Sequence, residues 1–295
     1  MKRFFAILLL FCMIHACAAA KQPQLSADTP PEIQKLIEIA REELGTVEEK
    51  DGTTKYGEWA GDPRAEWCAE FLCWAVNETD QQHGTQLLNH VYPQYSGQNV
   101  GRDWFLRQGR YVNRVGSIPD WGYQWSWKTG ELLSKNSYIP RSGDFMFLGY
   151  EGNFNTSHVA LVEYVEEAAD DVYVHVIEGN NPDRVQRNVY PLSKHQILGY
   201  GVYQNEDIGT TMRMGNKGYI VETLQKQLCA MELLTEYDIT GVYDNRTAAA
   251  VIQVQRSIRH VPNGIADYST QKAIREGYQK SLLYSPEVWV VEDKE

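Results

Sequence analysis

The sequence has no excess of basic charge. It contains 28 lysine and arginine residues against 39 aspartate and glutamate residues, giving a formal net charge of −11. Nucleic-acid binding depends on clustered basic side chains that neutralise phosphates. Docking on an anionic membrane surface depends on the same kind of cluster. The composition therefore argues against nucleic acid as a partner and against attachment to a membrane through the protein surface.

Long apolar segments are also scarce, and the run at the N-terminus is short. Lys2 and Arg3 precede an apolar run, 4–14, and small residues follow at 16–20. The run is too short to span a bilayer comfortably and has the layout of a secretory signal peptide. We therefore expect export to the periplasm, the cell envelope or the medium. The segment 14–17 also resembles a lipoprotein cleavage box, in which Cys17 would carry a lipid, and we expect membrane attachment only in that case.

Cysteine is rare, and the number outside the signal region is odd. Of five cysteines, Cys12 and Cys17 lie in that region, which leaves Cys68, Cys73 and Cys229. An odd number leaves at least one unpaired thiol in an exported chain, unless it pairs between chains. A thiol that stays free outside the cytoplasm usually has a function.

Cys68 lies at the expected start of a buried helix. Cys68, Phe71, Leu72 and 75–76 recur at helical spacing, and Asp62 and Pro63 upstream are typical of a helix start. The free N–H groups and the dipole at a helix N-terminus favour the nucleophilic thiolate. The alternative is a small buried core cysteine.

The chain divides into a helical first half, a run of strands and a helical end, which predicts an α+β fold. Helices are expected over 32–44 and 65–77, with a loop at 53–60. Short strands separated by turns predict an antiparallel sheet. They are expected at 145–148, 157–165, 172–180, 185–190 and 197–203. After 216 the spacing is helical again, and segments 241–251 and 264–274 repeat a pattern of glycine turn, capping aspartate and alanine-bearing helix. We expect a signal peptide at 1–20, linkers at 21–31 and 206–215, domains at 32–205 and 216–280, and a tail at 281–295.

Two polar residues follow the cysteine at positions suited to catalysis. His158 opens one expected strand and Glu178 ends the next. If these strands are neighbours, the two side chains meet at one end of the sheet. A thiol nucleophile needs a base, and the base needs a group that orients it. We assign these roles to Cys68, His158 and Glu178, and expect Asn180 to orient the same ring or to bind substrate. No spacing of histidine, cysteine and carboxylate is typical of zinc, although these three residues form a potential ligand set, and we expect neither metal nor cofactor.

Tryptophans concentrate around the candidate nucleophile. All but Trp289 of the eight fall between 59 and 127. Aromatic side chains in a groove stack on sugar rings or cover a peptide. Trp67, Trp125 and Trp127 are therefore candidates for substrate binding, and the alternative is that they build a core in a loop-rich region.

The motifs around these residues together resemble the CHAP family of papain-like cysteine amidases and endopeptidases, which cleave bacterial peptidoglycan. The resemblance covers about 35–205, and it implies a core of N-terminal helices packed on an antiparallel sheet. It also implies that Cys68, His158, Glu178 and Asn180 occupy the catalytic positions. The segments that carry it are Trp67–Phe71, Pro140–Phe145, Ser157–Val162 and Ile177–Asn180.

Residues 216–280 are similar to a three-helix peptidoglycan-binding module. Leu224, Gln225 and the two glycine-to-alanine repeats carry this likeness, whereas Cys229 and 253–255 depart from the usual choices. The two resemblances imply an exported, monomeric peptidoglycan hydrolase that needs no cofactor. It would cut either the amide between muramic acid and L-alanine or a peptide bond of the stem or cross-bridge. The alternatives are a non-catalytic wall-binding scaffold and a secreted cysteine protease or toxin.

Overall fold

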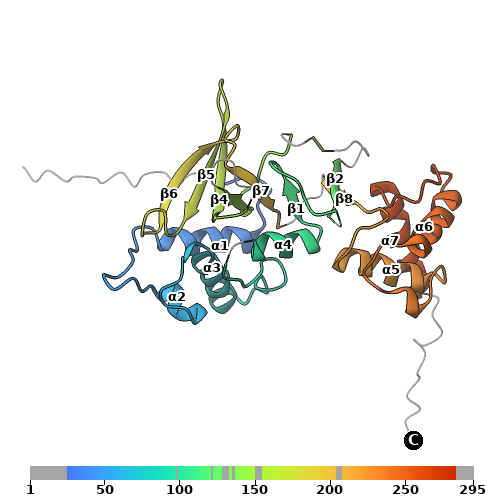
Figure 1. Cartoon of the computed structure of the whole chain (residues 1–295), viewed down its shortest axis with the longest axis horizontal. Helices are drawn as coiled ribbons and strands as arrows, with labels where there is room; N and C mark the ends of the chain where they lie inside the picture. Colours follow the sequence, from blue (N-terminus) through green and yellow to red (C-terminus); the bar gives the residue numbers. More distant parts are fainter. Residues whose placement is uncertain are drawn as a thin grey trace, which may run out of the picture.

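The computed structural model describes residues 25–283, except 98, 121, 128–132, 135–136, 150–154 and 204–207. The expected signal peptide, Cys17 and the tail beyond 283 lie outside the described residues. Within this part, no helix combines the length and the apolar character needed to cross a membrane. The structure confirms an α+β fold with N-terminal helices, an antiparallel sheet and C-terminal helices (Figure 1).

The central element is a six-stranded antiparallel sheet in the order β1-β7-β3-β4-β5-β6. Side chains alternate between its faces, as strand geometry requires. In β3, Phe145 and Phe147 join the core shared with the helices, whereas Met146 and Leu148 join a second core on the other face. The strands are β1 (Tyr111–Asn113), β3 (Phe145–Leu148), β4 (His158–Glu167), β5 (Val172–Glu178), β6 (Gln186–Pro191) and β7 (Ile197–Gly201).

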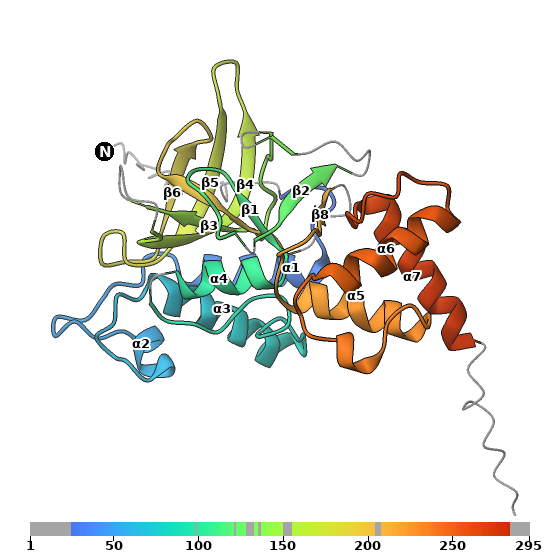
Figure 2. The same ribbon diagram turned by 45° about the vertical axis from the view of Figure 1, so that its right-hand side comes forward.

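Helices cover one face of this sheet (Figures 1 and 2). The helices that lie against the sheet are α1 (Pro31–Glu42), α3 (Cys68–His83) and α4 (Val100–Arg107), and α2 (Lys55–Ala60) packs on α3. The expected loop at 53–60 is wrong, because α2 forms there. The Thr54 hydroxyl caps this helix by accepting from the Gly57 N–H at 3.0 Å. The expected cap of α3 is also wrong, because the N-cap is Trp67 and not Asp62.

A buried ion cluster ties α1 to the sheet. Glu163 of β4 is fully buried, and its carboxylate lies 2.6 Å from Nε of Arg41 and 2.7 Å from Nε of Arg187. Burial alone would raise the pKa of Glu163, but the hydrogen bonds from the two arginines outweigh it and lower the pKa. The pairing therefore lets a carboxylate remain charged inside the protein.

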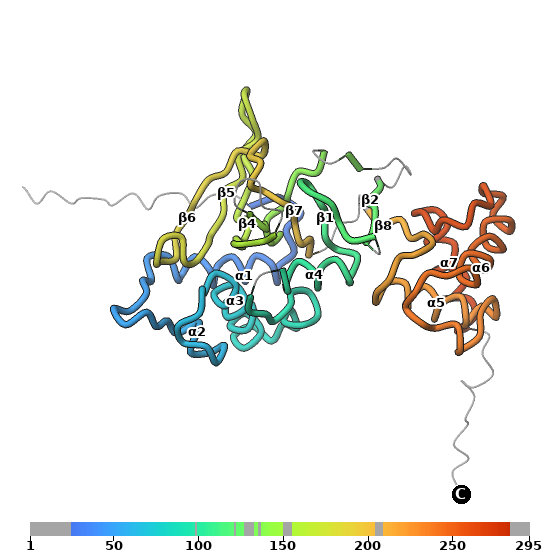
Figure 3. Tube along the Cα trace, in the orientation of Figure 1, coloured from blue at the N-terminus to red at the C-terminus, as the bar shows by residue number. Residues whose placement is uncertain are grey.

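The segment between α3 and β3, in which no helix or strand was predicted, contains regular structure. It forms α4, β1 and β2 (Gln124–Trp127). Strand β2 pairs with β8 (Ile208–Thr211), which lies in the expected linker at 206–215. Figures 1 and 3 show the C-terminal helices beyond β2 and β8, at the opposite end from β6. Tyr123 joins the hydrophobic core of these helices, and its hydroxyl donates to the Lys217 carbonyl at 2.7 Å.

The C-terminal unit is built on the internal repeat. It comprises α5 (Tyr219–Ala230), the 3₁₀ turn η1 (Glu236–Asp238), α6 (Asn245–Ser257) and α7 (Tyr268–Leu283). Asp244 caps α6 by accepting from backbone N–H groups, and Asp267 accepts equivalently from Thr270. The aspartates therefore act as the sequence predicted.

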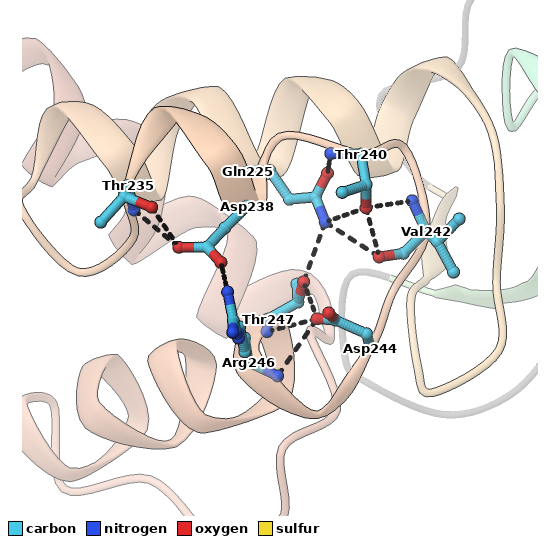
Figure 4. Close-up of polar contacts among 8 residues, drawn as sticks. All are labelled: Gln225, Thr235, Asp238, Thr240, Val242, Asp244, Arg246 and Thr247. Carbon is cyan, nitrogen blue, oxygen red and sulfur yellow. Dashed lines mark hydrogen bonds and ion pairs between the residues drawn. The ribbon is translucent and has the colours of Figure 1, made fainter.

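Two buried glutamines hold the turns of this repeat. Gln225 accepts from the Gly241 N–H at 2.9 Å. Its amide nitrogen donates to the Val242 carbonyl at 2.9 Å, a contact drawn in Figure 4. Gln255 accepts from the Gly264 N–H at 2.9 Å and donates to the next carbonyl at 2.8 Å. Gln255 therefore reproduces the role of Gln225 in the second copy of the repeat. This role explains the glutamine at 255, one of the positions that depart from the usual module pattern.

Candidate active site

Cys68 is the first residue of α3. No side chain caps this helix end, so the first backbone N–H groups have no side-chain acceptor. They lie at the positive end of the helix dipole, which favours negative charge on nearby atoms. Cys68 is half-buried and is not in a disulfide. The other cysteine of this helix, Cys73, is buried, and its thiol lies against the Pro93 and Tyr95 carbonyls.

His158 is the first residue of β4 and lies between Cys68 and Glu178. Its Nε2 is 3.0 Å from Oε2 of Glu178, and the ring is close enough to Cys68 for the thiol to shift the pKa of the imidazole. Because Nε2 is engaged by the carboxylate, Nδ1 is the nitrogen left for the thiol. The structure thus brings Cys68, His158 and Glu178 together in the order that a thiol nucleophile, its base and an orienting carboxylate would need.

Glu178 ends β5 and is fully buried. Its Oε1 accepts from the Asn181 amide at 2.7 Å, from the Tyr190 hydroxyl at 3.0 Å and from the Asn188 amide. These donors satisfy the carboxylate and leave Oε2 directed at His158. None of these three donors was predicted from the sequence. Strand alternation carried a signal for two of them, because Asn188 and Tyr190 share a face of β6, the neighbour of β5.

The charges of the cluster reinforce one another. Burial alone would lower the pKa of His158, but interactions with Cys68 and Glu178 raise it to about 10. Burial alone would raise the pKa of Glu178, but His158 and the neighbouring amides lower it. At neutral pH the site therefore holds an imidazolium beside a carboxylate.

The structure bears on one of the two roles expected for Asn180, the orientation of the ring. Its backbone is left-handed, with φ of 58°, and its side-chain amide donates to Oε2 of Glu66 at 2.8 Å. The contact to Glu178 comes from the next residue, Asn181, so Asn181 takes the orienting place expected for Asn180. Asn180 still lines the cleft beside Cys68.

The three tryptophans predicted to bind substrate lie in different parts of the fold. Trp67 is 1% exposed, so it lies in the core and offers no ring face to a substrate. Its ring stacks on Tyr56 at 5.4 Å, and a Cβ on Gly179 would lie 2.5 Å from it. Trp67 thus packs between α2 and the turn that follows Glu178.

Trp125 and Trp127 both lie in β2, away from the Cys68 cleft. Trp125 lines a separate cavity of about 340 Å³ with Tyr123 and Gln124. Its indole N–H donates to the Tyr111 carbonyl at 2.7 Å. Trp127 pairs with Ile208 in the ladder between β2 and β8.

A cleft runs across the cluster and has two halves that share Glu66, Cys68, Ser157 and His158. One half has a volume of about 400 Å³ and the other about 340 Å³. Both halves reach the thiol and the imidazole, so an extended substrate can lie across Cys68. In the part of the chain that the structure describes, no group of three or more histidine, cysteine, aspartate or glutamate residues is arranged to hold a metal ion.

Family models match both parts of the chain. Residues 59–180 match the CHAP domain, and residues 217–274 match a putative peptidoglycan binding domain. A comparison with curated proteins gives no match.

Solved structures show weaker similarity. The crystal structure of Ly7917 is 19% identical with a TM-score of 0.30, and covers 61% of this chain and 65% of that chain. Ly7917 with the hydrolyzing product of MDP is 18% identical with a TM-score of 0.29, and covers 62% and 66%. A periplasmic domain of the EpsAB fusion protein of the Vibrio vulnificus type II secretion system is 19% identical with a TM-score of 0.21, and covers 52% and 67%. The chain thus spans just under two thirds of Ly7917.

The family matches coincide with the features described above. Cys68, His158 and Glu178 all fall within 59–180, and the glutamine-held repeat falls within 217–274. The chain therefore joins a CHAP domain to a C-terminal peptidoglycan-binding domain.

Proposed function

We propose that this protein is an exported peptidoglycan hydrolase that cleaves an amide bond with Cys68 as nucleophile. The observation that carries the proposal is the Cys68–His158–Glu178 chain on a cleft of a CHAP domain. The C-terminal domain supports peptidoglycan as the substrate, because it supplies a second attachment to the wall. Export is proposed from residues 1–20.

The first chemical step joins the substrate to Cys68. The Cys68 thiolate attacks the amide carbonyl carbon and forms a C–S bond. The uncapped N–H groups at the start of α3 hold the developing oxyanion. His158, protonated at neutral pH, donates its proton to the leaving amine as the C–N bond breaks, which leaves a thioester.

The second step restores the site. Neutral His158 takes a proton from water, and the resulting hydroxide attacks the thioester carbonyl. The C–S bond breaks, the carboxylic acid leaves, and Cys68 returns to the thiolate beside an imidazolium. Glu178 stabilises the imidazolium at the start and end of the cycle while remaining ionised.

Two bonds fit this chemistry: the amide between muramic acid and L-alanine, and a peptide bond of the stem or cross-bridge. Purified protein incubated with purified sacculi, followed by mass spectrometry of the soluble products, separates them. Stem peptides with free L-alanine amino ends identify an amidase. Shortened or un-cross-linked muropeptides identify an endopeptidase.

The matched variants are Cys68→Ala and Cys229→Ala, which remove one thiol each. Cys68→Ala should abolish product formation while binding to sacculi persists, and Cys229→Ala should retain activity. Absence of products from several wall types, with binding intact, would refute the hydrolase and favour a wall-binding scaffold. Cleavage of unfolded proteins but not sacculi would favour a general protease.

A further inference from the structure

The two halves of the cleft differ in chemistry. The larger half is lined by apolar groups that include Tyr95, Phe147 and Val159. The smaller half is lined by Asn181, Lys194, Gln196 and other polar groups. A substrate that spans Cys68 therefore meets an apolar wall on one side and amides with an ammonium on the other.

Apart from His158 of the catalytic cluster, Lys194 is the one basic side chain among the residues that line the polar half. It is half-buried, and its Nζ lies 4.6 Å from the centre of the Tyr190 ring. The cation–π contact holds the ammonium at the cleft wall without neutralising its charge. The Tyr190 hydroxyl bonds Glu178, so the ring is fixed by the catalytic cluster.

Two hydrogen bonds fix the position of the Lys194 backbone. Its N–H donates to the Pro191 carbonyl at 2.9 Å, and its carbonyl accepts from Arg114 at 2.8 Å. Among the described residues, no carboxylate forms an ion pair with Nζ. Glu66, the acidic group shared by both halves, already accepts from Asn180. The ammonium therefore faces the cleft with donor capacity left for a ligand.

We propose that Lys194 binds a free carboxylate of the peptide stem and so makes the enzyme selective for a carboxylate over a carboxamide at that position. This inference rests on the proposed function, because it names the part of peptidoglycan that occupies the polar half. A partly buried ammonium and a carboxylate attract each other more strongly than an exposed pair. The neutral amides of Asn181 and Gln196 complete the polar wall, and Glu66, the carboxylate that also lines this half, accepts from the Asn180 amide.

The experiment compares two soluble muramyl peptides that differ only in whether the α-carboxyl of the second residue is free or amidated. The wild type should cleave the free acid with a kcat/KM about tenfold to a hundredfold higher. Lys194→Met should lose this preference through a higher KM for the free acid, with the amidated peptide unaffected. Lys194→Arg should retain it. Lys217→Met removes the same charge from an exposed site outside the cleft and should leave the preference intact.

Binding of the same two peptides to the Cys68→Ala form tests the inference without catalysis. Tighter binding of the free acid, lost on adding Lys194→Met, supports the carboxylate site even if no bond is cleaved, so failure of the hydrolase proposal remains distinguishable. Equal binding or cleavage of both peptides by the protein with Lys194 intact would overturn the inference. An equal loss for both peptides in Lys194→Met would also overturn it.

Discussion

Replacing Glu178 by glutamine removes the negative charge that holds His158 protonated. The carboxylate lies 3.0 Å from Nε2 of His158 and has 0% exposure, so solvent screens the contact little. A hydrogen bond to a charged partner contributes about 1.5–3 kcal/mol. At 1.36 kcal/mol for each pH unit, the pKa of His158 should fall by about one to two from its value of about 10.

The assay is the pH dependence of kcat/KM on a soluble muropeptide. The proposed mechanism needs the imidazolium, so activity in the wild type should decline on the alkaline side near pH 10. In Glu178→Gln this limb should move to about pH 8–9, and kcat/KM at pH 7 should fall about 10- to 100-fold. The glutamine also presents an N–H₂ group to the donors of Asn181, Asn188 and Tyr190, which adds to the loss.

Glu166→Gln is the matched control. It removes a carboxylate from another histidine of the same sheet, His175, at a similar distance of 3.1 Å, but Glu166 is 62% exposed. This variant should leave the alkaline limb in place. An unmoved limb in Glu178→Gln, in a variant shown to be folded, would refute the role assigned to the carboxylate.

The same linkage predicts how stability depends on pH. The pKa of His158 is raised above its ordinary value of 6.5, so the imidazolium contributes fully below about pH 6.5. This contribution should disappear as pH rises through about 10. Urea unfolding at several pH values should show the decline in the wild type, and Glu178→Gln should show a smaller one. An equal decline in both proteins would contradict the prediction.

Three further substitutions test parts of the fold that support the site. Glu163→Gln leaves two arginines without their buried partner and should lower the free energy of unfolding by about 3–5 kcal/mol, measured by urea denaturation. A loss below about 1 kcal/mol would contradict the stabilising role assigned to the ion cluster. Gly179→Ala places a Cβ 2.5 Å from the Trp67 ring and should cost about 1–3 kcal/mol with reduced activity, which a thermal melt and the muropeptide assay would check. Asn181→Ala should lower kcat more than KM in the same assay, and an unchanged kcat would show that the amide does not orient the carboxylate.

Much of this protein followed from local sequence signals. Helical spacing placed Cys68 at a helix start, because an apolar stripe must face a core. Strand alternation and turns placed His158 at the beginning of one strand and Glu178 at the end of another. The repeated glycine and aspartate pattern identified the C-terminal helices, since capping and turn chemistry act within a few residues.

Tertiary structure decided which of these residues meet. The pairing of β4 with β5, in a register that includes a shift after Val162, brings His158 and Glu178 together. A shift of one position would turn a side chain to the other face, so turn residues alone did not distinguish Asn180 from Asn181. The burial of Trp67 and the pairing of β2 with β8 likewise depend on segments far apart in the chain. The sequence alone thus determined the elements and the reactive residue types, whereas long-range packing and strand register determined the geometry of the site.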